Sequence, residues 1–473
     1  MYVQGKKKNV DATVGPIFSK MIVFVIPLML TNLLQQLYSM ADNMVVGQFS
    51  GEPNALGAVG STSAYVSILT ALFIGFSAGS GVVVARSFGA RDNESLSRAT
   101  HSALLFGIIS GTVIGILGFV FAEPILIALD TKTELLSLAV LYARIIAVGM
   151  PAISVYNFGA SVLRSTGDSR TPLYTLTATG ILNVILNLVL VICFHLSVAG
   201  VAIATVTAHY VSATVIVTVL AKRKNEPYAF SLSKLRFDGK IISNILRLGV
   251  PAAIQGSLFG FTNMFLHKAL NTFPTPVISA RTIATSIDVL LSTAINTYLH
   301  VTMTFTGQNL GAEKPERIKR ALAYSLIQVV VLGVGVGQLM LAFYEPLVGL
   351  YVAADNPYRA EIFEAAHTIM AVMLTSYFLG ALNESLSGFL RGLGYSLPPM
   401  IVSVAGICIF RCIWIFLIFP NIGTLVGLYL IYPISWTITG LGLALMSLLV
   451  WKKKISPRFE KNGNDCSQPS KSS

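Results

Sequence analysis

Long apolar segments alternate with short polar ones along the whole chain of 473 residues. Each apolar segment holds about 20 residues or more, which is enough for an α-helix to cross the hydrocarbon core of a bilayer. The pattern therefore predicts an all-α membrane protein with transmembrane helices throughout. The twelve expected helices cover residues 21–46, 57–85, 99–121, 135–163, 172–194, 198–221, 242–271, 277–308, 319–343, 360–390, 399–419 and 426–451.

Two short sequences recur in the two halves of the chain. Leu163–Pro172 reads LRSTGDSRTP and Leu390–Pro399 reads LRGLGYSLPP, and Leu, Arg, Gly, Ser and Pro agree at one constant offset. Phe88–Ala90 and Leu310–Ala312 repeat a shorter motif at a closely similar offset. We interpret the chain as one unit of six helices that occurs twice. An even number of helices keeps both copies in the same orientation, which is the parallel-repeat arrangement of secondary transporters.

The repeat divides the chain into two pseudo-symmetric six-helix bundles joined by a basic linker. We expect the final tail, which is polar, to be disordered. The predicted parts are a cytoplasmic tail at residues 1–20, a first bundle at 21–221, a cytoplasmic linker at 222–240, a second bundle at 241–451 and a cytoplasmic tail at 452–473.

Composition and charge agree with a membrane protein and argue against a nucleic-acid partner. Only 11% of the residues are charged, whereas soluble domains carry about 25%. The net charge is +12, but the Lys and Arg residues concentrate in alternate loops, which include the linker and both tails. Because basic loops stay on the cytoplasmic side, we predict a multi-pass protein of the plasma (inner) membrane with both termini in the cytoplasm.

No pattern of an enzyme, a disulfide framework or a metal centre is present. Cys193, Cys408 and Cys412 lie in expected helices and Cys466 lies in the last tail, without pairing or metal-ligand spacing, so they are read as free thiols. The first apolar segment is too long for a cleavable signal peptide. Neither HExxH nor GxSxG occurs. We expect no enzymatic activity and no cofactor other than a coupling ion.

Three carboxylates fall deep inside expected helices, at Asp42, Asp288 and Glu384. A carboxylate at the centre of a spanning helix costs at least about 2.5–3.5 kcal/mol on insertion scales. Each therefore needs a proton, a cation or a partner. The equivalent of Glu384 in the first half is the neutral Asn157. Glu384 is interpreted either as a packing acid or as a second coupling or substrate acid.

Asp42 is the acid with the richest polar surroundings. At about 1.5 Å of rise per residue, Asn187 and Thr205 lie about 10 Å below the outer ends of their helices, near the depth of Asp42, and Asn183 lies one turn deeper. Four oxygen-bearing side chains thus converge on one layer, which suits Na⁺. The carboxylate can instead take a proton, because burial disfavours its charged form. The alternative is a network that only ties the helices together.

The helix of Asp42 carries further polar residues on the same face. Asn32, Gln35 and Tyr38 recur at helical spacing. We expect this face to line protein or a water-filled cavity. Tyr38 is interpreted either as a packing or lipid-contact residue or as a contact for an apolar cationic substrate through its ring. Pro27 lies in the same helix and is interpreted either as a static kink or as a hinge.

A second polar line runs along residues 277–308. Asp288, Asn296 and His300 lie on it at multiples of four residues, so the line winds around the helix and is expected to face an internal cavity. His300 is either a proton shuttle near neutral pH or a hydrogen-bonded interior histidine. Arg411 lies at a depth similar to that of Asp288, and we therefore expect an ion pair between them.

Taken together, the motifs resemble the multidrug and toxic compound extrusion (MATE) family over residues 16–451. They are YSMADNMVVGQFSG around Asp42 with LGAVG after it, and the pairs FGARD/LGAEK and LRSTGDSRTP/LRGLGYSLPP. The resemblance implies two six-helix bundles that form a V-shaped cleft. It also implies export of organic, often cationic compounds in exchange for Na⁺ or H⁺. In the DinF-like branch, which the chain resembles most, the cation site uses residues that match Asp42, Asn183 and Thr205.

The chain departs from that branch at one position. The N-x-x-x-D motif of the branch reads Asn183-Val-Ile-Leu-Asn187 here, so the second acid is absent. The site then holds one formal negative charge instead of two. This loss favours proton coupling through Asp42 and leaves Na⁺ as the other possibility.

These observations predict a monomeric secondary antiporter for small organic compounds, cationic or amphipathic. Cation binding at Asp42 is expected to neutralise it, to change helix packing near Pro27 and to lower affinity for the substrate. The alternative is a flippase for a lipid-linked saccharide. A flippase should present several deep cationic side chains to the pyrophosphate, and this chain offers chiefly Arg411.

Overall fold

The computed structural model describes residues 9–270 and 272–465, and every regular element in this part of the chain is helical. Within these residues, 12 helices are long and apolar enough to cross a membrane. The predicted all-α class and the predicted number of spans are thereby confirmed. Contacts divide the chain into two compact units. The first contains the residues up to Asp11 and Ile22–Ser257, and the second contains Ala12–Met21 and the residues from Leu258 onward.

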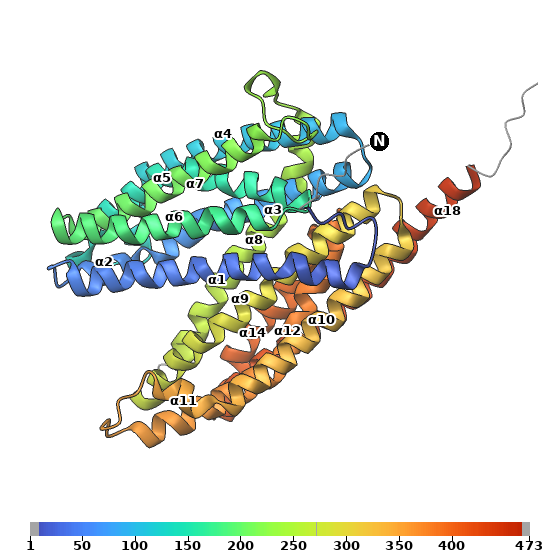
Figure 1. Cartoon of the computed structure of the whole chain (residues 1–473). Helices are drawn as coiled ribbons and strands as arrows, with labels where there is room; N and C mark the ends of the chain where they lie inside the picture. The colour runs from blue at the N-terminus through green and yellow to red at the C-terminus, as the bar shows by residue number, and fades with distance from the viewer. Residues whose placement is uncertain (1–8, 271, 466–473) are drawn as a thin grey trace, which may run out of the picture. The chain divides into compact units, whose positions relative to one another are not determined.

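The first unit is a bundle built around α5, which packs against α3, α4 and α7, while α6 packs against α7 (Figure 1). A π-helical turn, Val189–Cys193, extends α6 to the full length of a membrane span. The helices of this unit are α1 (Ile17–Phe49) from Ile22 onward, α2 (Ala55–Ser61), α3 (Ser63–Gly89), α4 (Asn93–Ala128), α5 (Thr133–Ser165), α6 (Arg170–Leu188), α7 (Ser197–Lys222) and α8 (Gly239–Leu270) up to Ser257.

The second unit is built around α12, which packs against α9, α10 and α17. It also contains the first turn of α1 and the end of α8. Two π-helical turns, Val404–Ile409 and Trp414–Ile418, flank the short α14. The helices of this unit are α9 (Thr275–Gly311), α10 (Pro315–Ala342), α11 (Tyr344–Gly349), α12 (Arg359–Gly392), α13 (Leu397–Ser403), α14 (Phe410–Ile413), α15 (Phe419–Ile422), α16 (Leu425–Tyr429), α17 (Ile431–Val450) and α18 (Ser456–Asp465).

The repeated sequence motifs fold alike in the two units. Gly167 and Gly394, which occupy equivalent positions of the longer motif, both have a φ of 89°. Arg91 and Glu313, which directly follow the shorter motif in each half, both have a φ of 55°. The two glycines end α5 and α12 in a left-handed turn that residues with a side chain rarely adopt. The duplication inferred from the sequence therefore extends to the backbone conformation of the connecting loops.

Close contact between α3 and α8 explains why most of α8 belongs to the first unit. A Cβ atom on Gly79 would lie 2.4 Å from the carbonyl oxygen of Ile245, and one on Gly249 would lie 2.7 Å from the Cα of Phe76. Two small residues thus allow the two backbones to touch, as is common between membrane helices. The boundary between the units falls inside α8, whereas the linker boundaries at residues 221 and 241 follow the sequence repeat.

Hydrogen bonds hold the described residues near the N-terminus, and the described part of the last tail is helical. The backbone N–H of Val10 donates to Gly167 O at 2.9 Å in the first unit, and that of Ala12 donates to Gln308 Oε1 at 2.9 Å in the second. Residues 452–465 are helical and extend α17 through a π-helical turn into α18. The expectation of a disordered tail from Lys452 is therefore wrong up to Asp465, and Cys466 lies outside the described residues.

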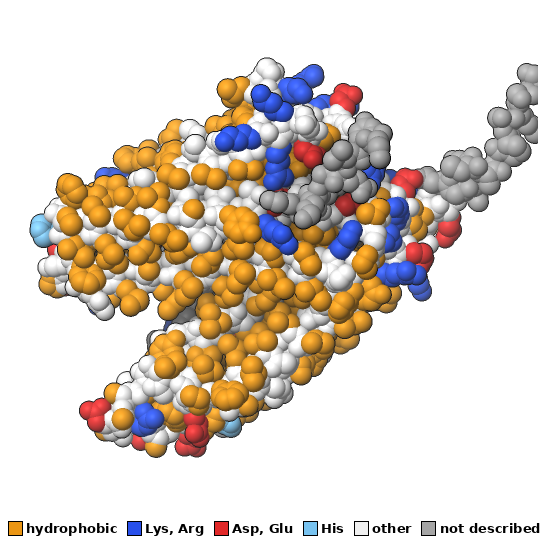
Figure 2. Space-filling view, in the orientation of Figure 1, with side chains coloured by type: hydrophobic (Ala, Val, Ile, Leu, Met, Phe, Trp, Pro, Cys, Tyr) orange, Lys and Arg blue, Asp and Glu red, His pale blue; other side chains and the backbone are white. Residues whose placement is uncertain are grey.

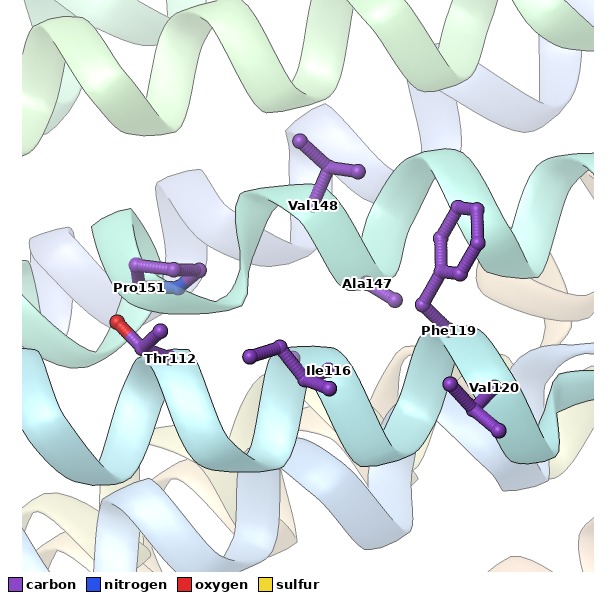
Figure 3. A pocket seen from close by; sticks show the side chains of 8 residues that line it. Thr112, Ile116, Phe119, Val120, Ala147, Val148 and Pro151 are labelled. Carbon is purple, nitrogen blue, oxygen red and sulfur yellow. The ribbon is translucent and has the colours of Figure 1, made fainter.

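Apolar side chains cover the flanks of the helices, and basic side chains gather toward one end of them (Figure 2). An apolar groove runs along α4 and α5 beside Pro151 (Figure 3). Ile116, Val120 and Val148 on its walls are each more than half exposed. Because Thr112 supplies the only polar side chain of its lining, the groove suits lipid chains and offers an ion no side-chain ligand beyond one hydroxyl.

Candidate functional site

The Asp42 carboxylate lies where α1, α6 and α7 of the first unit meet. Asn187 of α6 donates from Nδ2 to Asp42 Oδ1 at 2.5 Å, and Thr205 of α7 donates to Asp42 Oδ2 at 3.3 Å. Asn183, one turn from Asn187 on α6, donates from Nδ2 to Thr205 Oγ1 at 3.3 Å and accepts from Asn187 Nδ2 at 3.3 Å. The structure thus brings together the four residues that the depth argument had grouped.

Burial makes this cluster suitable for a small cation. Asn187 is fully buried and Asn183 is 5% exposed, while Asp42 is half-buried. Asn187 Oδ1 is enclosed without a hydrogen-bond partner among the described residues. An enclosed acceptor without a donor costs free energy, and a bound cation or hydronium would satisfy it. Tyr142 of α5, which the sequence argument overlooked, is 8% exposed and interacts electrostatically with Asp42.

The rest of the polar face of α1 is less enclosed. Tyr38 donates to the carbonyl of Thr177 at 3.4 Å, with its ring against Gly180. Asn32 is half-buried, and Gln35 is exposed. Pro27 is buried, and α1 continues through it; the hydroxyl of Thr31 donates to the Pro27 carbonyl at 2.7 Å.

In the second unit, the structure does not pair Asp288 with Arg411. Asp288 interacts instead with the Tyr377 hydroxyl of α12 and with Arg281, two turns earlier on α9. Arg411 of α14 donates from Nε to Ser435 Oγ at 3.2 Å, and its guanidinium lies 4.4 Å from the centre of the Tyr432 ring. An aromatic side chain, rather than the acid, occupies the space beside Arg411.

Arg281 is a buried charge that sequence reasoning missed. It is 8% exposed, donates from Nε to Thr285 at 2.8 Å and from Nη1 to the Tyr429 hydroxyl at 3.2 Å. The signal for it was weak, because Arg281 lies near the start of its apolar segment, where a long side chain usually reaches water. Its partner Tyr429 is distant in the chain and belongs to α16.

The other predicted residues of the second unit do not form one site. Asn296 is exposed on α9, and His300 is half-buried there. Glu384 is half-buried on α12 and interacts with the charge of Arg391, which is 6% exposed. Arg391 lies two turns further along the same helix, so its charge acts on Glu384 from that end of α12.

A separate ion pair closes the loop between α5 and α6. Arg223, just after α7, contacts Asp168, which also accepts from the Thr171 hydroxyl at 2.6 Å. Burial alone would raise the pKa of Asp168, but the Thr171 hydrogen bonds and the Arg223 guanidinium outweigh it and hold the pKa below its usual value. This pair holds the repeated motif of the first half in place.

Cys193, Cys408 and Cys412 are free thiols. Within the described residues, no group of three His, Cys, Asp or Glu side chains could hold a metal ion.

Comparison with known proteins identifies the family. The MatE family model matches residues 27–189 and 251–417. The probable multidrug resistance protein YoeA of Bacillus subtilis is 27% identical over 448 residues, which cover 93% of this chain and 95% of the relative. The FAD transporter of Shewanella oneidensis is 28% identical over 320 residues, 66% of this chain and 70% of the relative.

The fold agrees with that match. A solved structure described as the outward-facing conformation of a multidrug resistance MATE family transporter superposes with a TM-score of 0.85 at 21% identity, covering 97% of this chain and all of that chain. The family model spans most of both helical bundles, with the Asp42 cluster inside its first matched segment apart from Thr205. The chain therefore belongs to the MatE family of multi-pass membrane transporters.

Proposed function

We propose that this protein is a secondary antiporter that exports small organic compounds in exchange for H⁺ or Na⁺ bound at Asp42. The observation that carries the proposal is the half-buried carboxylate with an amide donor, Asn187, and a hydroxyl donor, Thr205, from two other helices, both of which also bond to Asn183. A carboxylate buried in a membrane protein in this way is functional by default.

The site can couple ion binding to helix packing because its members lie on three different helices. With Asp42 charged, the amide of Asn187 and the hydroxyl of Thr205 hold α1 against α6 and α7. A proton or Na⁺ on Asp42 weakens its hydrogen bonds to these donors and allows α1 to repack near Pro27. The ion favours one state only through this difference in affinity.

We base our choice of ion and of branch on the ligand set. Asp42 provides the one formal charge of the cluster, since Asn187 replaces a second acid. A single carboxylate with neutral partners can be neutralised by one proton, and we propose H⁺ as the coupling ion. Asn183 and Thr205 match the DinF-like branch, to which we assign the chain. We further propose a monomer with both termini in the cytoplasm.

The cargo proposal rests on the relatives. The relatives above are named for multidrug resistance and for FAD transport, and none of them as a lipid flippase. We therefore propose organic compounds, cationic or amphipathic, as cargo.

The test is export from proteoliposomes with each ion gradient imposed separately. Wild-type protein should drive ethidium transport with a proton gradient, and Asp42→Asn should lower the ion-driven rate to that of empty liposomes. Glu123→Gln is the matched control, because Glu123 is an exposed acid paired with Arg144 at 3.6 Å. Full ion-driven export by Asp42→Asn would contradict the proposal.

A further inference from the structure

The second unit holds a buried cluster with a charge of opposite sign to that of the Asp42 site. Two guanidinium groups, Arg281 and Arg411, are 8% and 7% exposed. The carboxylate that interacts with them is Asp288, and it acts on Arg281. The cluster therefore carries one positive charge in excess. Charges without a counter-ion are costly in a low-dielectric interior, so the excess charge indicates a ligand.

Arg411 has hydrogen-bond donors without an acceptor among the described residues. Among the described residues its only hydrogen-bond partner is Ser435, through Nε. Its two Nη groups have no hydrogen-bond partner in this part of the chain. A guanidinium fork of this kind matches a carboxylate or a phosphate with two parallel hydrogen bonds. The side chain is thus buried along its length, with its fork available.

Aromatic rings surround the same guanidinium groups. Tyr429 and Tyr432 are stacked with centroids 6.0 Å apart, and Tyr432 lies 5.4 Å from the ring of Trp436. Arg281 contacts Tyr429 and Arg411 contacts Tyr432. Rings packed in this way offer faces and edges to a planar aromatic group.

We propose that this cluster is a binding site for an aromatic anion, a carboxylate or phosphate joined to a planar ring system. Arg411 binds the anionic group, and Tyr432 and Trp436 contact the ring. Asp288 acts electrostatically on Arg281, while no such interaction links it to Arg411. The inference rests on the proposed export function, for which it defines a second class of cargo.

The experiment compares two probes that share one ring system. Riboflavin and flavin mononucleotide (FMN) differ by a phosphate, so the ratio of their dissociation constants isolates the anion contact. Binding is measured by flavin fluorescence anisotropy with the protein in neutral-lipid nanodiscs. Wild type should bind FMN at least about tenfold more tightly than riboflavin, as expected for hydrogen bonds to a charged group.

Variants of Arg411 test whether the preference for FMN over riboflavin comes from the cluster. Arg411→Gln should remove the FMN preference, and Arg411→Lys, which keeps the charge without the fork, should keep part of it. Arg320→Gln, an exposed arginine of α10 in the same unit, should leave the ratio unchanged. Equal binding of the two flavins by wild type would overturn the proposal. So would an FMN preference that survives in the folded Arg411→Gln protein.

A lipid phosphate is the other source of the same chemistry. Short-chain phosphatidylglycerol is therefore added as a competitor. Displacement of FMN by equimolar lipid would assign the cluster to a headgroup and overturn the proposal of an aromatic anion; no displacement supports it. The measurement is made at equilibrium without an ion gradient. Absence of ion-driven ethidium export by the wild-type protein would therefore refute the antiporter proposal, and the ratio of flavin dissociation constants would still be judged separately.

Discussion

The two units share their connecting turns but differ in the charge they bury. Gly167 and Gly394 end equivalent helices with the same φ. The first unit holds the half-buried carboxylate of Asp42 among amides and a hydroxyl, whereas the second buries Arg281 and Arg411 beside tyrosines. A duplicated fold thus fixes the backbone, while single substitutions on facing helices set the chemistry of each half.

The largest expected effect is a difference in ion-driven export between variants of the acids in the two units. Asp42→Asn should abolish ion-driven ethidium export, while Asp288→Asn and Glu384→Gln should retain it, because neither of these acids is linked to the three-helix cluster. Transport under an imposed proton gradient measures all three. Loss of coupling in folded Asp288→Asn, with the protein monodisperse on a sizing column, would show that both halves carry the ion.

A second change acts on the contact between α1 and α6. A Cβ atom on Gly180 would lie 1.8 Å from the Tyr38 ring, so Gly180→Ala should push α1 away and loosen the bonds of Asp42. We expect the ion concentration for half-maximal transport to rise about tenfold, which corresponds to about 1.4 kcal/mol.

The double variant with Tyr38→Ala removes the clash and should restore most of that affinity. Gly335→Ala is the control, at a helical glycine of the second unit with no atom within 4 Å of the added Cβ. It should leave the ion concentration for half-maximal transport unchanged. If the double variant needs the same raised ion concentration for half-maximal transport as Gly180→Ala alone, the loss of ion affinity does not come from a clash with the Tyr38 ring.

A third pair of variants tests the shared backbone. Gly167→Ala and Gly394→Ala should each cost about 1–2 kcal/mol, since an L-residue is strained in the left-handed region. At Gly167 the new Cβ would also lie 2.2 Å from the Val10 carbonyl oxygen, which adds to the cost. Thermal midpoints of the detergent-solubilised variants check this, and an unchanged midpoint in both would contradict a strained turn.

The smallest effect concerns a pair that exists in one half alone. Arg223 and Thr171 hold the pKa of Asp168 below its usual value, whereas the equivalent position in the second half is Tyr395. The folded pKa is the lower one, so this stabilisation is present above the unfolded value of about 3.9 and is lost as pH falls through the folded value. Asp168→Asn should therefore lower the thermal midpoint at pH 7, and the difference from wild type should shrink toward pH 3.

The sequence predicted those features that depend on local pattern. Apolar length located the helices, and helical rise placed Asn187 and Thr205 at the depth of Asp42, because both quantities are counted along the chain. The cluster around Arg281 could not be found in this way. Its burial depends on Tyr429, which is distant in sequence, and on the way in which α9 and α16 fold together.

The expected pair of Asp288 and Arg411 failed for a related reason. Depth gives the height of a residue in the membrane but not the direction in which it points. The direction of Arg411 is set by π-helical turns, Val404–Ile409 and Trp414–Ile418, which a count at about 100° per residue does not anticipate. The helical tail after Lys452 was missed because composition alone does not report that α17 continues into it.

The π-helical turns on either side of Arg411 also make the direction of its side chain depend on the number of residues in each turn of this helix. A π-turn accommodates one residue more than an α-turn, and one residue corresponds to a rotation of about 100° for everything that follows. Conversion of Val404–Ile409 to an α-turn absorbs the deletion of one of its residues, whereas a deletion from the α-helical turn that carries Arg411 has no extra residue to absorb it. The second deletion rotates the residues on one side of it by about 100° against those on the other, so the phase of this helix matters as much as the identity of the arginine.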